Sequence, residues 1–481
     1  MGLRDQTNRQ QGALFESISP PKCENSSMNP SAIEIMHLRR GSLTLTLAQN
    51  IGQAEQLRIP VTTERTGVQM TDKTAVADTE NIPLTGRSSD ATETYNSLIT
   101  LFGWLEKNDY RGYDTFDGLS AKYLNPLTFG NRFLRIALQQ GVRRFPLNLR
   151  PLLGIEKAHS TKGMGFLARG FIRLCEATGD PIWAEKAKFC LQWLIEHEQP
   201  GYSGACWGNH FDYQSRGGSI PKGTPTVVWT SLIGHAFLDG YDYFGNDEYL
   251  QIAISICEHI TADLRTQADG EGLCINYTPG PDSWVHNANV LGGGFLARTY
   301  SHTKNDSYRA LAQRAMTYTA QHQRPNGSWY YAEKSNSHWV DNFHTGYVLD
   351  CFKQYAENTG DDRFDDVLRK GYGFWKKTFF LPDGTPKYYD YKTLPLDIQC
   401  SSQAIDTLVF FADRDPDSVQ LALTVTRWTI ANMQDKTGYF YYRRYSRWVV
   451  NKTPTLHWGQ ATMLCALAGL YKQLRGQKSP A

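Results

Sequence analysis

The chain has 481 residues, of which 41% are hydrophobic and 20% are charged, a composition typical of a globular protein with a large core. Its 50 basic and 48 acidic residues nearly cancel, and this balance argues against a nucleic-acid-binding role, which depends on clustered lysine and arginine. Aromatic residues make up 12% of the chain, more than a core of this size needs, and this surplus indicates a cleft lined with aromatic side chains.

The N-terminal part of the chain differs from the rest. Residues 1–90 are polar, with a single strand-like stretch at 42–48, and this composition predicts a tail or small extension. The first twenty residues lack the basic and apolar regions of a secretory signal, and no stretch approaches the roughly 18 apolar residues that a membrane span requires. The nine cysteines form no CxxC pair and indicate reduced thiols, so we expect a cytoplasmic protein.

From residue 91 to about 475 the pattern predicts helices, followed by a short tail at 476–481. Apolar residues recur at helical spacing in windows of about 14 to 18 residues, between loops rich in Gly, Pro, Tyr and Trp. Similar helical stretches recur at a nearly regular interval along this part of the chain. They contain Phe166, Phe237, Phe295, Val348, Ile405 and Met463.

Each repeat consists of a helix, a turn with Gly or Asn, and a second amphipathic helix, which is the pattern of an αα-hairpin. A first hairpin from Tyr95 to about Gln140 brings the number to about six. The long loops fall at one end of each hairpin, as expected if they converge on one mouth. The sequence therefore predicts an all-α fold, an (α/α)6 toroid, in preference to an open solenoid.

Five loop segments carry polar and aromatic residues in a distinctive order. They are residues 110–119 (YRGYDTFDGL), 207–216 (WGNHFDYQSR), 286–289 (HNAN), 339–347 (WVDNFHTGY) and 454–461 (PTLHWGQA). These segments resemble those of VpsJ-type bacterial polysaccharide-biosynthesis proteins over about residues 95–474. The resemblance implies a six-hairpin glycosidase-like toroid and a role in making or modifying a surface polysaccharide, without defining a reaction. His457 stands where the family pattern has an arginine before Trp-Gly-Gln.

Hydrolysis of a glycan on such a scaffold usually needs two carboxyl groups, one protonated and one ionised. The loops offer several, each with a structural alternative. Asp114 and Asp117 also fit a turn, and Asp341 also fits the N-cap of a helix that starts at residue 342. The candidate catalytic residues are Asp114, Asp117, His210, Asp212, Asp341 and His344.

Two further hypotheses stay open beside hydrolysis. A polysaccharide lyase or uronate epimerase would remove a proton next to a carboxylate with a His or Tyr base, and neighbouring arginines would clamp the acid group. A non-catalytic glycan-binding or assembly subunit would use the same aromatic cleft. The candidate substrate-binding residues are Tyr113, Trp207, Asn209, Arg216, His286, Asn287, Asn289, Trp329, Trp339, Tyr389, Tyr442, Arg444, His457, Trp458 and Gln460.

Other classes receive little support. The segment 323–329 is similar to the Gln-to-Trp repeats of terpene cyclases, but the Asp-rich initiating motif of those enzymes is missing and the loops are polar. Cysteine and histidine spacing does not match a zinc site, and no phosphate-binding glycine loop is present, so we expect no metal and no cofactor. The expected partner is a polysaccharide or oligosaccharide, with no nucleic acid and no membrane span.

Overall fold

The computed structural model describes residues 89–215 and 218–476. The predicted N-terminal extension and C-terminal tail therefore lie almost wholly outside the described residues, as does Arg216. The α-helices are α1 (Ser89–Lys107), α2 (Arg132–Arg144), α3 (Thr161–Thr178), α4 (Pro181–Glu196), α5 (Val227–Phe244), α6 (Asp247–Ala262), α7 (His286–Thr303), α8 (Asp306–Gln321), α9 (Asn342–Thr359), α10 (Asp365–Phe379), α11 (Ile398–Phe410), α12 (Ser418–Met433) and α13 (Thr462–Gly476).

The strands are short and lie in the loops between helices. They form three antiparallel sheets with the orders β1-β2, β3-β4 and β5-β6-β7. Their bounds are β1 (Tyr213–Gln214), β2 (Ser219–Ile220), β3 (Thr266–Asp269), β4 (Gly272–Ile275), β5 (Leu396–Asp397), β6 (Arg443–Arg444) and β7 (Val450–Asn451).

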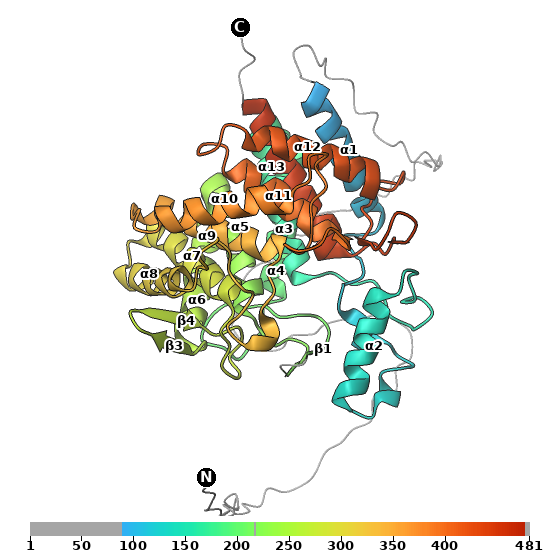
Figure 1. Ribbon diagram of the computed structural model, residues 1–481, viewed down its shortest axis with the longest axis horizontal. Helices are drawn as coiled ribbons and strands as arrows, with labels where there is room; N and C mark the ends of the chain where they lie inside the picture. The colour runs from blue at the N-terminus through green and yellow to red at the C-terminus, as the bar shows by residue number, and fades with distance from the viewer. Residues whose placement is uncertain (1–88, 216–217, 477–481) are drawn as a thin grey trace, which may run out of the picture. The chain divides into compact units, whose positions relative to one another are not determined.

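Six helices, α3, α5, α7, α9, α11 and α13, form an inner ring (Figure 1). Each packs against the next, and α13 packs against α3, so the ring is closed. Small residues permit this close approach: a Cβ added to Gly170 of α3 would collide with Leu464 and lie 3.1 Å from the Cα of Cys465, both on α13. The predicted (α/α)6 toroid is confirmed, and closure excludes the open solenoid.

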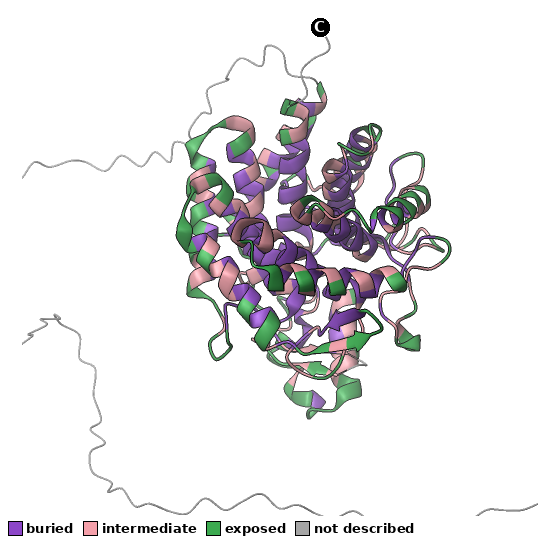
Figure 2. Ribbon diagram, turned by 90° about the vertical axis from the view of Figure 1, so that its left-hand side faces the viewer, coloured by how far each residue is buried: buried purple, intermediate pink, exposed green. Residues whose placement is uncertain are grey.

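The outer layer supplies one partner to each inner helix. Helices α4, α6, α8, α10 and α12 pack on α3, α5, α7, α9 and α11, and α1 packs on α13. The sixth hairpin is thus made by helices from the two ends of the described chain. Figure 2 shows the buried residues concentrated between these layers, with exposed residues on the outside. None of the helices within residues 89–215 and 218–476 is both long enough and apolar enough to cross a membrane.

The predicted first hairpin from Tyr95 to about Gln140 is wrong. Helix α2 contacts β1 and the short 3-10 helix η1 (Asp117–Ser120) instead of pairing with α1. It buries only Gln139 and Val142, so it lacks the wide apolar stripe that an outer helix needs. Figure 1 shows α2 beside the ring of helices rather than within it.

The turns between inner and outer helices follow the predicted chemistry. Gly179 ends α3 with a left-handed φ of 71°, and the Asp180 side chain caps α4 by accepting the backbone N–H of Ile182 at 3.0 Å. Gly245 and Asn246 repeat this arrangement between α5 and α6. These tight turns connect the two helices of each hairpin at one end of the toroid. The long loops therefore lie at the other end, where the inner helices begin.

Candidate active site

The loop mouth is centred on a buried pair formed by Asp114 and His457. Asp114 lies in the loop after α1, and His457 lies in the π-helical turn η4 (Leu456–Ala461) that precedes α13. Asp114 Oδ2 and His457 Nδ1 are 2.5 Å apart, and both side chains are almost fully buried. Burial alone would raise the pKa of Asp114, but His457 and neighbouring donors outweigh it and hold this pKa at about 2. The carboxylate is therefore ionised at neutral pH.

Backbone bonds hold the two loops together at this pair. Tyr113 and Thr455 form an isolated parallel β-bridge, and the N–H of Leu456 donates to the carbonyl of Tyr113 at 2.8 Å. The bridge aligns the residues that follow Tyr113 and Leu456, namely the aspartate and the histidine. Contact between segments near opposite ends of the described chain thus creates the pair.

An ion pair behind Asp114 positions its loop. Arg150 Nε lies 2.7 and 2.9 Å from the two oxygens of Asp117, and both side chains are buried. Asp117 also accepts the backbone N–H of Asp114 at 2.9 Å, and Arg150 donates to the Asp114 carbonyl at 2.7 Å. Burial raises the pKa of Asp117 to about 6, against the opposing charge of Arg150. The structure thus gives Asp117 a positioning role.

Three further side chains surround the pair. His210 is half-buried; burial lowers its pKa, and the nearby charge of Asp114 opposes that shift. Lys162, in the first turn of α3, has a pKa lowered to about 8 by burial, with Asp114 acting in the opposite direction. Its ammonium lies 4.9 Å from the ring centre of Trp229, and that ring lies 5.9 Å from His457. Two histidines and a lysine therefore lie near the Asp114 carboxylate.

A second aspartate and histidine pair lies at the start of α9. Asp341 caps this helix by accepting the N–H of His344 at 3.0 Å, as the capping interpretation predicts. Its other oxygen lies 2.7 Å from His344 Nδ1 and accepts the indole N–H of Trp339 at 3.0 Å. The Trp339 ring stacks on Tyr331 with centroids 4.6 Å apart. Asp341 thus caps α9 and also lies beside His344 in the mouth.

The arginines of the mouth already have partners. Arg143 donates from Nε to the hydroxyl of Tyr442 at 3.0 Å, and Arg443 donates from Nε to Asp397 at 2.7 Å. Arg444 donates to Asn432 at 3.0 Å, at the end of α12. Each of these three guanidinium groups thus donates to a protein acceptor. This pairing weakens the hypothesis that arginines clamp an acid group of the substrate.

Half-buried aromatic rings surround the polar groups. Trp458 is representative: it stacks beside His457, with ring centroids 5.7 Å apart, and faces Phe116 at 5.2 Å. Such rings present flat apolar faces that suit stacking against sugar rings. The half-buried aromatic residues near the two pairs are Phe116, Tyr213, Trp229, Tyr277, Tyr331, Trp339, Tyr389 and Trp458.

Several predicted binding residues lie in the core instead. Trp207 is fully buried, and its indole N–H donates to the carbonyl of Leu194 at 3.0 Å. Trp329 is buried as well and donates to the carbonyl of Thr319 at 2.8 Å. Trp207 therefore belongs to the framework that supports the mouth, whereas Trp329 also lines the small pocket beside Asp341 and His344.

Two buried amides tie loops to helices. Asn289 accepts the N–H of Ile275 on β4 at 2.9 Å and donates to the carbonyl of Ala315 on α8 at 2.7 Å. Gln460 accepts the N–H of Phe440 at 2.7 Å and donates to its carbonyl at 2.9 Å. Because their polar atoms bind protein backbone, both side chains serve structure rather than a ligand.

The remaining candidates are dispersed. Asp212 is partly exposed and pairs with Arg135 at 3.2 Å, outside the Asp114 cluster. Tyr113 belongs to a small apolar cluster, and Asn209 lies in the loop with its carbonyl accepting a backbone N–H. His286 is buried with Nε2 2.6 Å from Glu333, and Asn287 is buried beside it; both line a small pocket that they share with Asp341 and His344.

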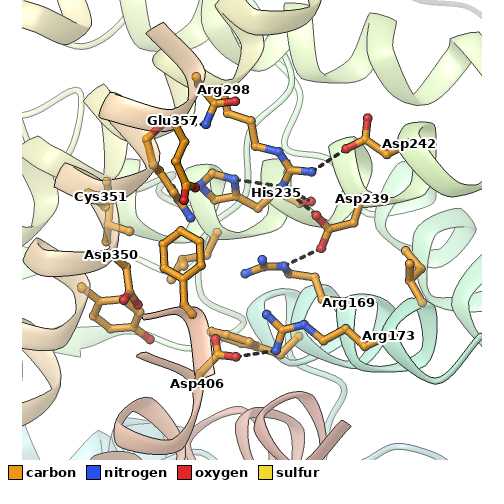
Figure 3. A pocket seen from close by; sticks show the side chains of 18 of the residues that line it. Arg169, Arg173, His235, Asp239, Asp242, Arg298, Asp350, Cys351, Glu357 and Asp406 are labelled. Atoms are coloured by element: carbon orange, nitrogen blue, oxygen red, sulfur yellow. Dashed lines mark hydrogen bonds and ion pairs between the residues drawn. The ribbon is translucent and has the colours of Figure 1, made fainter. Parts of the chain in front are cut away.

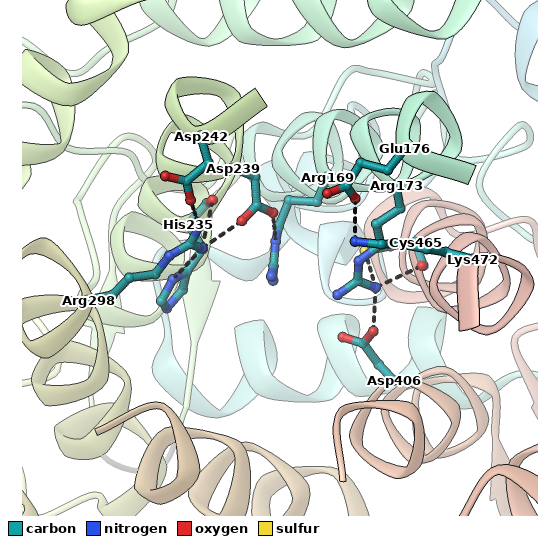
Figure 4. A network of polar contacts seen from close by, with 10 residues as sticks. All are labelled: Arg169, Arg173, Glu176, His235, Asp239, Asp242, Arg298, Asp406, Cys465 and Lys472. Carbon is teal, nitrogen blue, oxygen red and sulfur yellow. Dashed lines mark hydrogen bonds and ion pairs between the residues drawn. The ribbon is translucent and has the colours of Figure 1, made fainter. Parts of the chain in front are cut away.

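A second polar site lies on the axis of the toroid, at the end opposite the loops. Its cavity measures about 470 Å³ and is lined by the second halves of the inner helices (Figure 3). The ionisable lining includes Arg169, Arg173, His235, Asp239, Asp242, Arg298, Asp350 and Asp406. Figure 4 shows the ion pairs that join helices here, namely Asp239 with Arg169 and Arg298, Asp242 with Arg298, and Asp406 with Arg173.

Sequence reasoning missed Lys162 and the axial cavity. The signal was present as charged residues four apart within otherwise apolar helices, Arg169 with Arg173 and His235 with Asp239. Such a charged stripe on an inner helix must face a cavity or another charge.

Among residues 89–215 and 218–476, no three His, Cys, Asp or Glu side chains gather in a way that could hold a metal ion.

Comparison with known proteins identifies the fold but no family. No protein-family model and no curated protein matches the sequence. Solved structures do match. The shared feature is the (α/α)6 toroid.

The GH76 α-mannanase of Bacteroides thetaiotaomicron is 13% identical with a TM-score of 0.52, covering 67% of this chain and 88% of its own. A sugar epimerase from a ruminal bacterium is 12% identical with a TM-score of 0.52, over 68% and 91% of the two chains. A polysaccharide lyase is 11% identical with a TM-score of 0.53, over 82% and 100%. Three different activities on one fold mean that the reaction must be argued from the site.

Proposed function

We propose that the protein is a carbohydrate-active enzyme that moves a proton on a glycan bound in the loop mouth. The observation that carries this proposal is the buried contact between Asp114 Oδ2 and His457 Nδ1. The carboxylate orients the imidazole and stabilises the positive charge that forms when the ring takes up a proton. Because Nδ1 lies against Asp114, Nε2 is the nitrogen that exchanges a proton with substrate.

The partners of the mouth carboxylates favour proton transfer over hydrolysis. Asp117 is bound by Arg150, Asp341 by His344 and Trp339, and Asp114 by His457. A hydrolase needs a carboxyl that is protonated and can reach the leaving group. Since Asp114 has a pKa of about 2, it does not supply that proton at neutral pH. Epimerisation or β-elimination with a histidine base therefore fits the mouth best.

Hydrolysis is the second candidate. An ionised carboxylate is the form that a general base or nucleophile requires, and Asp114 is ionised. The acid would then be His210 or His457 rather than a second carboxyl. A glycan-binding subunit without catalysis would use the same aromatic faces.

The substrate class rests on two lines of support. The loop motifs resemble those of VpsJ-type proteins, which act in bacterial surface polysaccharide synthesis. The solved structures with this fold carry the names of an α-mannanase, a sugar epimerase and a polysaccharide lyase. We therefore propose a bacterial exopolysaccharide or its oligosaccharides as the substrate and a role in its synthesis or modification.

The test is incubation of the full chain with neutral and uronic-acid bacterial polysaccharides in deuterated water. Chain length, ultraviolet absorbance and deuterium at carbon are read on the same samples. Deuterium without shortening indicates an epimerase, shortening with absorbance a lyase, and shortening alone a hydrolase. Glycan binding with none of these changes would overturn the enzymatic proposal in favour of a binding subunit.

Substitution then assigns the base. His457→Gln removes the proton-exchanging nitrogen and should lower turnover by about 100-fold or more, while glycan binding is retained. His338→Gln is the matched control, because this histidine lies exposed in the loop before α9. Equal activity in wild type and His457→Gln would reject His457 as the base.

A further inference from the structure

The axial cavity is lined by four cations and six carboxyl groups that largely neutralise one another. Arg169 and Arg298 share Asp239, with nitrogen to oxygen distances of 2.8 and 2.6 Å. The other pairs within the lining are Arg298 with Asp242, Arg173 with Asp406, and Lys472 with Glu176. Glu357 pairs with Lys353, which lies outside the lining. Among the described residues of the lining, Asp350 is the carboxyl without a cationic partner.

Asp350 presents an unused oxygen to this cavity. Its Oδ2 accepts from Gln403 at 2.8 Å and from Thr407 at 3.0 Å, whereas Oδ1 is buried without a partner. Burial and the neighbouring charge of Asp406 raise the pKa of Asp350 well above its ordinary value. Both causes favour the neutral form of this carboxyl. Because Oδ2 already accepts two bonds, Oδ1 is the oxygen that remains to bond a ligand.

Two other buried polar atoms of the lining lack partners. His235 is 1% exposed, and its Nδ1 lies 3.5 Å from Arg298, which can only donate. The ring proton of His235 is therefore on Nε2, and Nε2 has no partner. Gln354 Oε1 is likewise buried and unpaired. The cavity thus offers three buried polar atoms without partners, Asp350 Oδ1, His235 Nε2 and Gln354 Oε1, which a ligand would satisfy.

These features define the chemistry of the ligand. Because the charges of the lining are paired with one another, an ionic ligand would find no unpaired opposite charge. The unpaired polar atoms suit hydroxyl groups, which can both donate and accept a hydrogen bond. Phe166, Tyr347 and Phe410 add apolar wall, and about 470 Å³ lies within the range of small-ligand sites. We propose that the axial cavity is a second carbohydrate site, which binds a neutral mono- or disaccharide at the end of the toroid opposite the loop mouth.

Calorimetric titration with D-glucose, D-mannose and cellobiose tests this site, with inorganic phosphate and D-glucuronate as ionic probes. The His457→Gln variant is used beside wild type, so that failure of the mouth as an enzyme leaves the measurement intact. Gln354→Leu and Asp350→Leu should each weaken neutral-sugar binding by about tenfold or more. The matched control is Gln420→Leu, an exposed position on α12.

Three results would overturn this assignment. One is binding of phosphate or glucuronate in place of neutral sugars, which would mean an anion site. Another is no heat with any probe, which would mean a water-filled cavity. The third is neutral-sugar binding that Gln354→Leu and Asp350→Leu leave unchanged, which would place the sugar elsewhere.

A different observation concerns the surface around α2. Seventeen large hydrophobic side chains are exposed in the described residues, and nine of them fall within residues 123–152. The nine are Tyr123, Leu124, Leu127, Phe129, Phe133, Leu134, Phe145, Leu147 and Leu152. We call this region the α2 lobe. Isolated exposed apolar residues are ordinary, but a concentration of this kind marks an interaction surface.

The α2 lobe carries charge of one sign. Residues 121–155 contain six Lys and Arg and no Asp or Glu, and three of the six pair with carboxylates outside this stretch: Lys122 with Glu156, Arg135 with Asp212 and Arg150 with Asp117. Arg132 and Arg144 are exposed, and no ion pair of the described residues includes them. A basic surface interleaved with Phe and Leu complements an anionic lipid surface, which takes apolar side chains at the level of its headgroups.

The lobe is firmly attached on its inner side. Tyr113, Ala121, Val142 and Ile155 form a separate small core beneath it. Gln139 is fully buried and bonds to the backbone of Gln214 in both directions, at 3.1 and 3.0 Å. The exposed apolar residues are therefore the outer face of a packed unit.

The geometry points to peripheral binding of the α2 lobe to an anionic membrane surface. The test is sedimentation of the full chain with vesicles of phosphatidylglycerol and phosphatidylcholine, or of phosphatidylcholine alone. We expect binding only with the anionic lipid, reduced by about tenfold or more in Phe129→Ser/Phe133→Ser and in Arg132→Glu/Arg144→Glu. Ile182→Ser/Phe189→Ser on α4, exposed to 40% and 43%, is the matched control.

Two results would contradict lipid binding. Wild type could fail to sediment with either vesicle, and a dimer lost in Phe129→Ser/Phe133→Ser would then assign the surface to a second copy. Alternatively, the lobe variants could sediment as wild type does, and the lipid contact would lie elsewhere.

Discussion

The buried ion pair between Asp117 and Arg150 should be the most sensitive point of the mouth. Their side chains are 3% and 2% exposed, and the guanidinium Nε lies 2.7 and 2.9 Å from the carboxylate oxygens. Asp117→Asn keeps an oxygen for the N–H of Asp114 but leaves the charge of Arg150 buried and unpaired. Breaking a buried pair in this way costs about 3–5 kcal/mol of unfolding free energy.

Urea unfolding of Asp117→Asn, Arg150→Met and the double variant at pH 7 measures the cost of breaking this pair. We expect each single change to cost about 3–5 kcal/mol, and the double variant to cost less than the sum because no lone charge is buried. Asp366→Asn removes the exposed partner of Arg369 and should leave stability unchanged. If each single change cost under about 1 kcal/mol, as at an exposed pair, the reasoning from burial would be refuted.

The remaining predictions concern the framework. Trp207→Ala should cost about 3–5 kcal/mol of stability in urea unfolding without weakening glycan affinity per folded molecule, whereas Trp458→Ala should weaken affinity with little loss of stability. Gly170→Val should lower the melting temperature measured by calorimetry, because α13 leaves no room for a Cβ and overpacking costs about 1–3 kcal/mol. Asn289→Ala should destabilise by about 2 kcal/mol or more in urea, because it frees a buried N–H and a buried carbonyl; a smaller effect would mean that water replaces the amide.

Local sequence patterns were enough to predict the helical repeats and the place of the loops. Regularly spaced helix pairs with Gly and Asn turns specify hairpins, because helix periodicity and capping are local properties. Local composition also identified Asp114, His344 and His457 as candidate site residues, because they are polar residues within aromatic loops. Placing the capping aspartate Asp341 before residue 342 needed only local chemistry as well.

Pairing and burial depended on the closed ring. Asp114 and His457 meet because ring closure brings α13 beside α3 and the loop after α1, a contact between distant parts of the chain that no local pattern encodes. Trp207 and Trp458 lie in similar polar and aromatic segments, yet one is core and one faces the mouth. The sixth hairpin also depends on ring closure. Helices α1 and α13 lie near opposite ends of the described chain, and they pack together only when the ring is closed.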